Sequence, residues 1–156
     1  VIDQAIQLLG PVDEVGGWVR AVRRDAVVPD DAFVELLHDS GAVSHLSVSL
    51  VAAAPGPRFR VLGTRAAYLK DGLDPQEAEL RAGAVPGGRG WGEESEGEWG
   101  QLCLGDDRRP VPTLPGDYPA FYRQMTDHMQ GRGPVPVDPL DSLHALEIIE
   151  ALTEAQ

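Results

Sequence analysis

Tyr68 and Lys70 are candidates for the recognition of a small polar molecule. They alternate with Ala67 and Leu69 in RAAYLK, a segment typical of a short β-strand, so their side chains share one face. Lys70 is the only lysine in a chain with 12 arginines. Its compact ammonium group suits a hydroxyl acceptor better than a guanidinium does. The alternative is a solvated lysine that deters pairing at a sheet edge.

The sequence contains no motif for a self-contained catalytic site. GGRGWG and PGPRFRVLG lack the strand–turn–helix context of a phosphate-binding loop, and there is no GxSxG or Walker lysine. The Glu-rich run EESEGE is typical of a solvated loop. Metal-ligand spacing is absent from the histidines and the single cysteine: His38, His45, His128, His144 and Cys103.

Composition narrows the class of protein. The net charge of −12 argues against nucleic-acid binding, which needs clustered basic residues. No apolar run approaches the ~20 residues of a membrane span, and the first residues do not resemble a signal peptide. One cysteine cannot form an internal disulfide. We therefore expect a soluble protein in the reducing cytoplasm.

The order of the expected elements predicts an α+β fold with an open, mainly antiparallel sheet and helices packed on one face. A helix is expected over residues 2–9, five strands over residues 12–70, with a bulge or bend at Gly16-Gly17, and two strands over residues 101–113. Turn signals at residues 39–41 and 105–107 predict hairpins, and Gly63-Thr64 separates the last two of the five strands. The strand within residues 42–53 directs His45, Ser47 and Ser49 to the face left for water, a ligand or another subunit.

Three further helices have recognisable starts. Asp74 is a cap candidate, followed by Pro75 and by Glu77 at the capping-box position, and Asp117 and Asp138 are caps for the last two helices. Tyr118, at a helix start, is a candidate substrate contact, whereas Tyr122 is expected in the core. The apolar stripe of the third helix is Phe121, Tyr122, Met125 and Met129, and that of the last helix is Leu140, Leu143, Leu146, Ile149 and Leu152.

Residues 83–99 form a long loop that is rich in glycine and glutamate and contains Trp91 and Trp99. Loops of this length in compact domains are usually functional or mobile. One hypothesis is a lid that closes over substrate, since aromatic rings suit the apolar faces of sugars. The alternative is a loop that packs permanently on its own domain or on a neighbouring subunit.

Four segments together resemble the C-terminal part of the glucose–fructose oxidoreductase / inositol dehydrogenase / MocA family. They are GTRAAYLKDGLDPQE, the loop from GWGEE to GEWG, PTLPGDYPAFY, and a last helix ending in LEIIEAL. The resemblance implies that residues 1–156 form a single C-terminal domain that supplies substrate contacts and an oligomer interface. It implies that NAD or NADP is bound by an N-terminal Rossmann domain absent from this chain.

The resemblance also implies where the catalytic groups lie. Family members carry Asp-x-x-x-His-x-x-Asp in the helix that VIDQAIQLLG resembles, and Asp3 matches its last Asp. The catalytic His would precede Val1 by one residue, its Asp partner would lie four residues further back, and a catalytic Lys would lie in the missing domain. Asp3 would then bind substrate, although a carboxylate there also suits the helix dipole.

The function implied is that of a fragment of an NAD(P)-dependent oxidoreductase acting on a sugar, polyol or related hydroxy compound. The fragment itself is expected to be inactive and to bind no cofactor or metal. The segment AAAPGP, where inositol-dehydrogenase-like members often carry an aromatic residue, speaks against myo-inositol as substrate. Two alternatives remain: a stand-alone carbohydrate-binding or interaction module, and a small enzyme that uses Asp and His on the open sheet.

Overall fold

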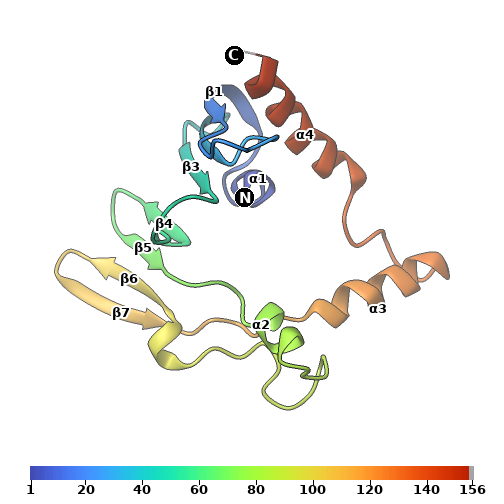
Figure 1. Ribbon diagram of the computed structural model, residues 1–156. Coiled ribbons are helices and arrows are strands. Elements are labelled where there is room, and N and C mark those ends of the chain that lie inside the picture. The colour runs from blue at the N-terminus through green and yellow to red at the C-terminus, as the bar shows by residue number, and fades with distance from the viewer. Residues whose placement is uncertain (155–156) are drawn as a thin grey trace. The chain divides into compact units, whose positions relative to one another are not determined.

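The computed structural model describes residues 1–154, which form two compact units. Unit 1 contains residues 1–54 and the chain from residue 137 onward, and unit 2 contains residues 55–136. The elements of unit 1 are α1 (Ile2–Leu9), β1 (Val12–Arg20), β2 (Asp31–His38), β3 (Val43–Ser49) and α4 (Pro139–Glu154) (Figure 1). A single domain was the expectation for residues 1–156, and the contacts divide it into these two units.

The three strands of unit 1 form an antiparallel sheet in the order β1-β2-β3. The predicted turn at residues 39–41 joins β2 to β3. The expected bulge at Gly16-Gly17 is wrong, because the register shift lies between Val12 and Glu14. Gly17 has a different role: its φ is +134°, and a Cβ there would overlap the carbonyl oxygen of Phe33 in the neighbouring strand.

The core of unit 1 lies on one face of this sheet, under α1 and α4. Its buried members are Ala5, Val34, Leu36, Ile148 and Leu152. The opposite face carries His45, Ser47 and Ser49, which are exposed as predicted.

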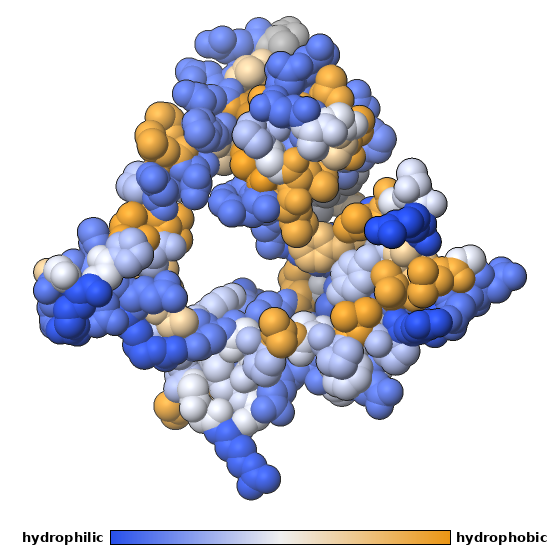
Figure 2. Space-filling model, turned by 180° about the vertical axis from the view of Figure 1, so that it is seen from behind, coloured by the Kyte–Doolittle hydropathy of each residue, from blue (hydrophilic) through white to orange (hydrophobic). Residues whose placement is uncertain are grey.

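The buried stripe predicted for α4 is mostly wrong. Leu152 is in the core, but Leu140, Leu143, Leu146 and Ile149 are 47–60% exposed. Apolar residues surround this helix, so periodicity alone does not identify its inner face. The residues of α4 that face the core are Ile148 and Leu152, which lie one turn apart. Other apolar residues of the protein lie at the surface, as Figure 2 shows.

Unit 2 contains a second antiparallel sheet, in the order β4-β5-β6-β7. Its strands are β4 (Phe59–Leu62), β5 (Ala67–Lys70), β6 (Gly100–Leu104) and β7 (Asp107–Val111). Its helices are α2 (Gln76–Arg81), the 3-10 turn η1 (Glu96–Glu98) and α3 (Tyr118–Met129). The expected hairpin at residues 105–107 is present, and the two short strands expected on either side of Gly63-Thr64 pair with each other as β4 and β5.

The helix starts of unit 2 follow the sequence more closely than its apolar stripes do. Asp117 accepts a hydrogen bond from the N–H of Ala120, as predicted for a cap. Asp74 accepts one from the N–H of Gln76, but the N-cap of α2 is Pro75, one residue later than predicted. Glu77 does not complete a capping box, because it pairs with Arg81 instead. Tyr122 is 70% exposed, so its expected place in the core is wrong.

The α+β class with open antiparallel sheets is confirmed, with the strands distributed over two sheets. Helices cover one face of the sheet in unit 1, where α1 and α4 share its core. Within residues 1–154, no helix is both long and apolar enough to cross a membrane.

Candidate functional site

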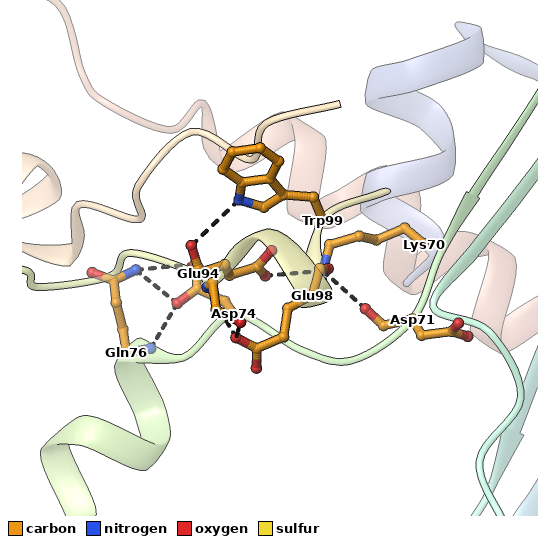
Figure 3. A network of polar contacts seen from close by, with 8 residues as sticks. Lys70, Asp71, Asp74, Gln76, Glu94, Glu98 and Trp99 are labelled. Carbon is orange, nitrogen blue, oxygen red and sulfur yellow. Dashed lines mark hydrogen bonds and ion pairs between the residues drawn. The ribbon is translucent and has the colours of Figure 1, made fainter. Parts of the chain in front are cut away.

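Lys70, the last residue of β5, is buried, and protein oxygens surround its ammonium group (Figure 3). Nζ donates to the backbone oxygens of Asp71 at 2.9 Å and Glu98 at 2.8 Å, and to Oε1 of Glu94 at 3.0 Å. An ammonium group has three N–H donors, so this arrangement uses all of them. Lys70 is therefore not the solvated edge lysine of the alternative interpretation, and its geometry is that of an anchor for residues 94–98.

Glu94 is the charged partner of Lys70. The side chains of this ion pair are 10% exposed for Lys70 and 5% exposed for Glu94. Removal of one member of a buried pair is strongly destabilising, because the other charge is left without a partner. The second carboxylate oxygen of Glu94, Oε2, is buried and receives no hydrogen bond from any residue within 1–154.

Tyr68 lies on the same face of β5 as Lys70, two residues earlier. Its ring packs over Gly100 of β6, where a Cβ would overlap the phenol. Gly100 is therefore needed for this close approach. No hydrogen bond engages the Tyr68 hydroxyl in the described part of the chain.

Gln76, at the start of α2, is fully buried and joins three segments of unit 2. Its Oε1 accepts from the indole Nε1 of Trp91 at 2.8 Å and from the backbone N–H of Tyr118 at 2.7 Å. Its Nε2 donates to both carboxylate oxygens of Asp74, at 3.0 and 3.2 Å. Gly116 passes so close that a Cβ would overlap the Gln76 amide.

The loop over residues 83–99 is held within unit 2. Trp91 is buried at the Gln76 amide, and the Trp99 indole donates to the backbone oxygen of Glu94 at 3.3 Å. Ser95 and Glu98 bond to each other across η1. These contacts agree with the interpretation in which the loop packs on its own domain. A lid movement of the loop stays untested.

Glu98 has a depressed pKa. The Ser95 hydroxyl, at 2.7 Å, and the Ser95 backbone N–H, at 3.0 Å, donate to its Oε2 and hold the pKa of this carboxyl below its usual value. The Glu98 carboxylate therefore stays ionised to a lower pH than an ordinary glutamate. Its bonds to Ser95 stabilise η1, the turn whose residue Glu98 provides one of the acceptor oxygens of Lys70.

The other two predicted site residues lie in different units. Asp3 is exposed on the first turn of α1, in unit 1. Tyr118 begins α3, in unit 2, and its side chain is 44% exposed although its backbone N–H is bound by Gln76. The structure therefore brings Tyr68 and Lys70 together, and it leaves Asp3 and Tyr118 accessible on the surfaces of their own units.

Sequence reasoning missed Glu94 and Gln76. Glu94 lies in EESEGE, a run interpreted as solvated, yet it is among the most buried carboxylates of the chain. The single lysine was the available signal, since a buried lysine needs a carboxylate partner. Nothing in the local sequence marks Gln76, because its partners, Trp91 and Tyr118, are 15 and 42 residues away.

The open face of the sheet in unit 1 carries a continuous row of side chains. Trp18 stacks on Phe33 with ring centroids 6.4 Å apart, and Arg20 lies over the Trp18 ring at 4.1 Å. Phe33 contacts His45, whose Nε2 lies 2.9 Å from Glu35. This row, which we call the open face, combines aromatic area with charged groups.

The sequence and the structure of this chain are similar to those of known proteins. The family model described as "Oxidoreductase family, C-terminal alpha/beta domain" of the GFO/IDH/MocA group matches residues 1–156. The chain is 29% identical over 160 residues to scyllo-inositol 2-dehydrogenase (NADP(+)) IolW of Bacillus subtilis, with 99% of this chain and 44% of that protein covered.

Two further relatives agree. The uncharacterized oxidoreductase YdgJ of Escherichia coli is 32% identical, with 96% of this chain and 44% of that protein covered. The crystal structure of a putative oxidoreductase from Bacteroides fragilis has a TM-score of 0.88 and 36% identity, with 98% of this chain and 47% of that chain covered. The chain thus spans less than half the length of these relatives. It belongs to the GFO/IDH/MocA oxidoreductase family and corresponds to the family's C-terminal alpha/beta domain.

Proposed function

We propose that this chain is the substrate-contacting and self-associating domain of an NAD(P)-dependent oxidoreductase that acts on a sugar, polyol or related hydroxy compound. The observation that carries the proposal is the family match over residues 1–156. The B. subtilis relative, whose name specifies scyllo-inositol and NADP(+), supports both the substrate class and the cofactor class.

The cofactor is assigned to a dinucleotide-binding domain outside these residues. The cavity in unit 2 does not suit a dinucleotide, since Asp71, Glu94 and Glu98 in its wall would repel a pyrophosphate. NAD or NADP, when bound, accepts or supplies the hydride of the reaction. The residues of this chain contribute by binding and orienting the substrate.

Asp3 and Tyr68 are the groups proposed to contact substrate hydroxyls, with Tyr118 as a further contact. An exposed carboxylate accepts directional hydrogen bonds from hydroxyl groups, and the unpaired Tyr68 hydroxyl both donates and accepts. Lys70 is proposed to act on the substrate indirectly, by anchoring residues 94–98, because its three donors are engaged.

The proposal is tested with the whole protein that contains this chain. NADH or NADPH formation is followed by absorbance with scyllo-inositol, D-glucose and related polyols as substrates. Asp3→Asn keeps the shape of Asp3 but removes its charge, so kcat/KM should fall roughly tenfold to a hundredfold. Asp13→Asn, at another exposed position in unit 1, is the matched control.

Equal kcat/KM values for the Asp3→Asn and Asp13→Asn variants would remove Asp3 from the substrate site. Absence of turnover with both cofactors and every polyol, together with polyol binding by the chain, would favour the alternative of a carbohydrate-binding module.

A further inference from the structure

The connection between β5 and α2 begins with the dipeptide Asp71-Gly72, directly after the buried Lys70. Asp71 is the only aspartate of the sequence that is followed by glycine, and the sequence contains no asparagine. In an Asp-Gly dipeptide, the side-chain carboxyl carbon and the next backbone nitrogen can close a five-membered succinimide ring. Whether they do so in a folded protein depends on what holds the two groups.

The structure leaves both reacting groups free. Asp71 is exposed, and its carboxylate points away from the hydrogen bonds of Lys70 (Figure 3). Within residues 1–154, no hydrogen bond or ion pair engages this carboxylate, and none engages the backbone N–H of Gly72. Both residues lie outside β5 and α2, so no strand or helix hydrogen bond has to break before they react.

Gly72 removes the steric obstacle to ring closure. A side chain on this residue would crowd the attacking nitrogen, and glycine has none. An added Cβ at Gly72 would meet nothing within 4 Å, so the space beside the residue is open. The turn therefore has room for the change of backbone conformation that brings the nitrogen to the carboxyl carbon, and a neighbouring nucleophile acts at a high effective concentration.

We propose that Asp71 is a site of spontaneous isoaspartate formation. The Gly72 nitrogen bonds to the side-chain carboxyl carbon of Asp71, and the carboxyl OH leaves with the N–H proton as one water. A second water then opens the ring. Cleavage of the new N–C bond restores aspartate, whereas cleavage of the bond from the nitrogen to the main-chain carbon gives isoaspartate.

The net change is an isomerisation, because one water is released and one is consumed. In isoaspartate the chain continues through the side-chain carbon, and the former main-chain carbonyl becomes a free carboxylate. The reaction needs no cofactor and no substrate, so it does not depend on the proposed oxidoreductase activity.

The new carboxylate forms at the group that Lys70 already binds. The main-chain oxygen of Asp71 is a neutral acceptor that lies 2.9 Å from Nζ of Lys70. In isoaspartate it belongs to a charged group, which is a stronger acceptor for an ammonium group. This carboxylate competes with Glu94, whose Oε1 lies 3.0 Å from the same nitrogen. Isomerisation thus loosens the hold of Lys70 on residues 94–98.

The test follows isoaspartate in the full folded chain during storage in warm neutral buffer. Isoaspartyl methyltransferase labels the new carboxylate with a methyl group from S-adenosylmethionine, and trypsin releases residues 71–81, in which the two isomers separate by chromatography. Because the sequence lacks asparagine, deamidation contributes nothing to the signal. Isoaspartate should accumulate in residues 71–81, at a rate within roughly tenfold of that in the urea-unfolded chain.

Two variants with matched chemistry identify the site. Asp71→Glu keeps the charge but requires a six-membered ring, so the total isoaspartate should fall roughly tenfold or more. Asp39→Glu is the control, because Asp39 is also exposed in a turn and is followed by the small residue Ser40. The yield of this variant should equal that of the unmodified chain.

The indole N–H of Trp99 reports the effect on Lys70, because it donates to the backbone oxygen of Glu94 at 3.3 Å. In NMR spectra of the stored chain, a second Trp99 signal should grow in proportion to isoaspartate. The signal of Trp18, which lies in unit 1, should stay single. An unchanged Trp99 signal at a high isoaspartate content would overturn the effect on Lys70.

Either of two results would overturn the site itself. One is a rate in the folded chain that is more than roughly tenfold below the rate in urea, which would show that the fold protects Asp71. The other is an isoaspartate yield that Asp71→Glu lowers no more than Asp39→Glu does.

Discussion

Asp30 illustrates how one carboxylate fixes a loop in this protein. Its side chain is fully buried at the end of the connection between β1 and β2, where it accepts from the backbone N–H of Val22 at 2.7 Å and from Nε of Arg23 at 2.7 Å. The Val22 N–H and then the Arg23 side chain hold the pKa of Asp30 below its ordinary value of 3.8.

The depressed pKa of Asp30 predicts acid sensitivity in unit 1. A group whose pKa is lower in the folded state binds a proton more readily in the unfolded chain, so its contribution to stability is present above about pH 4 and is lost as the pH falls through the folded pKa. Denaturant unfolding measured from pH 6 down to pH 2 should show this loss. The Asp30→Asn variant should have a flatter profile over the same range.

Asp25→Asn is the control for this experiment, since Asp25 lies in the same loop but is exposed. If the free energy of unfolding falls with pH as steeply in the Asp30→Asn variant as in the Asp25→Asn variant, then carboxylates other than Asp30 cause the acid sensitivity of unit 1.

The partners of individual residues were the features hardest to predict from the sequence. Tyr68 and Lys70 were paired correctly on one face because strand periodicity is local. The burial of Lys70 could not be deduced, because Glu94 and the backbone oxygen of Glu98 reach it from 24 and 28 residues away. A residue's partners in space are set by the fold and not by its neighbours in sequence.

At the scale of elements, the Gln76 amide connects α2, the loop over residues 83–99 and the start of α3. The three segments are those of the family resemblance, DPQE, GWGEE and PGDY, and they meet at this one side chain. In unit 2 these three segments are thus held together by side-chain hydrogen bonds of Gln76, and not by the pairing of strands in a sheet.

Gln76→Ala should destabilise unit 2 by about 2–6 kcal/mol. The reason is that the Trp91 indole and the Tyr118 backbone N–H would each lose their acceptor, at about 1–3 kcal/mol per buried donor. Urea denaturation of chains that also carry Trp18→Phe measures this, because the remaining tryptophans both lie in unit 2.

The neighbouring Glu77 supplies the comparison. It is exposed and pairs with Arg81 at the surface, so Glu77→Ala should change the free energy of unfolding by less than about 1 kcal/mol. Similar losses for the Gln76→Ala and Glu77→Ala variants would show that the junction does not hold the three segments together.

The ends of elements were predicted well, because caps and turns depend on a few neighbouring residues. The buried faces of helices were predicted poorly, because they depend on packing against other elements. The start of α3 at Asp117 and the β2–β3 turn follow from two to four residues. The inner face of α4 does not, because apolar residues occur all round this helix and only contact with α1 and the sheet selects Ile148.

At the scale of the whole molecule, large apolar groups remain at the surface of both units (Figure 2). They include the exposed stripe of α4 and Trp18 on the open face. The α+β class followed from the order of elements. The division into two units was not predicted, although both boundaries lie in stretches rich in proline and glycine, AAAPGP at residues 52–57 and GRGPVPVDP at residues 131–139.

We predict that the open face mediates self-association. Trp18→Glu would place a charge among the aromatic rings, so the dissociation constant of the oligomer should rise roughly tenfold or more, as measured by light scattering over a concentration series. Val27→Glu is the control at a 97% exposed site in the β1–β2 connection. A Trp18→Glu chain that associates as tightly as the Val27→Glu chain would exclude this face as the interface.

His38 sets the kind of motion that α1 can make. Its Nδ1 lies 2.8 Å from the carbonyl oxygen of Gly10, and its Nε2 lies 2.8 Å from the Ser44 hydroxyl, so one buried ring joins the end of α1 to β2 and β3. The Ser40 hydroxyl adds a bond to the Leu9 carbonyl. Sliding of α1 along its axis would break these bonds, and tilting of α1 would withdraw Ala5 and Ile2 from the core of unit 1. Both movements are therefore opposed, so we expect α1 to carry Asp3 as a rigid part of unit 1.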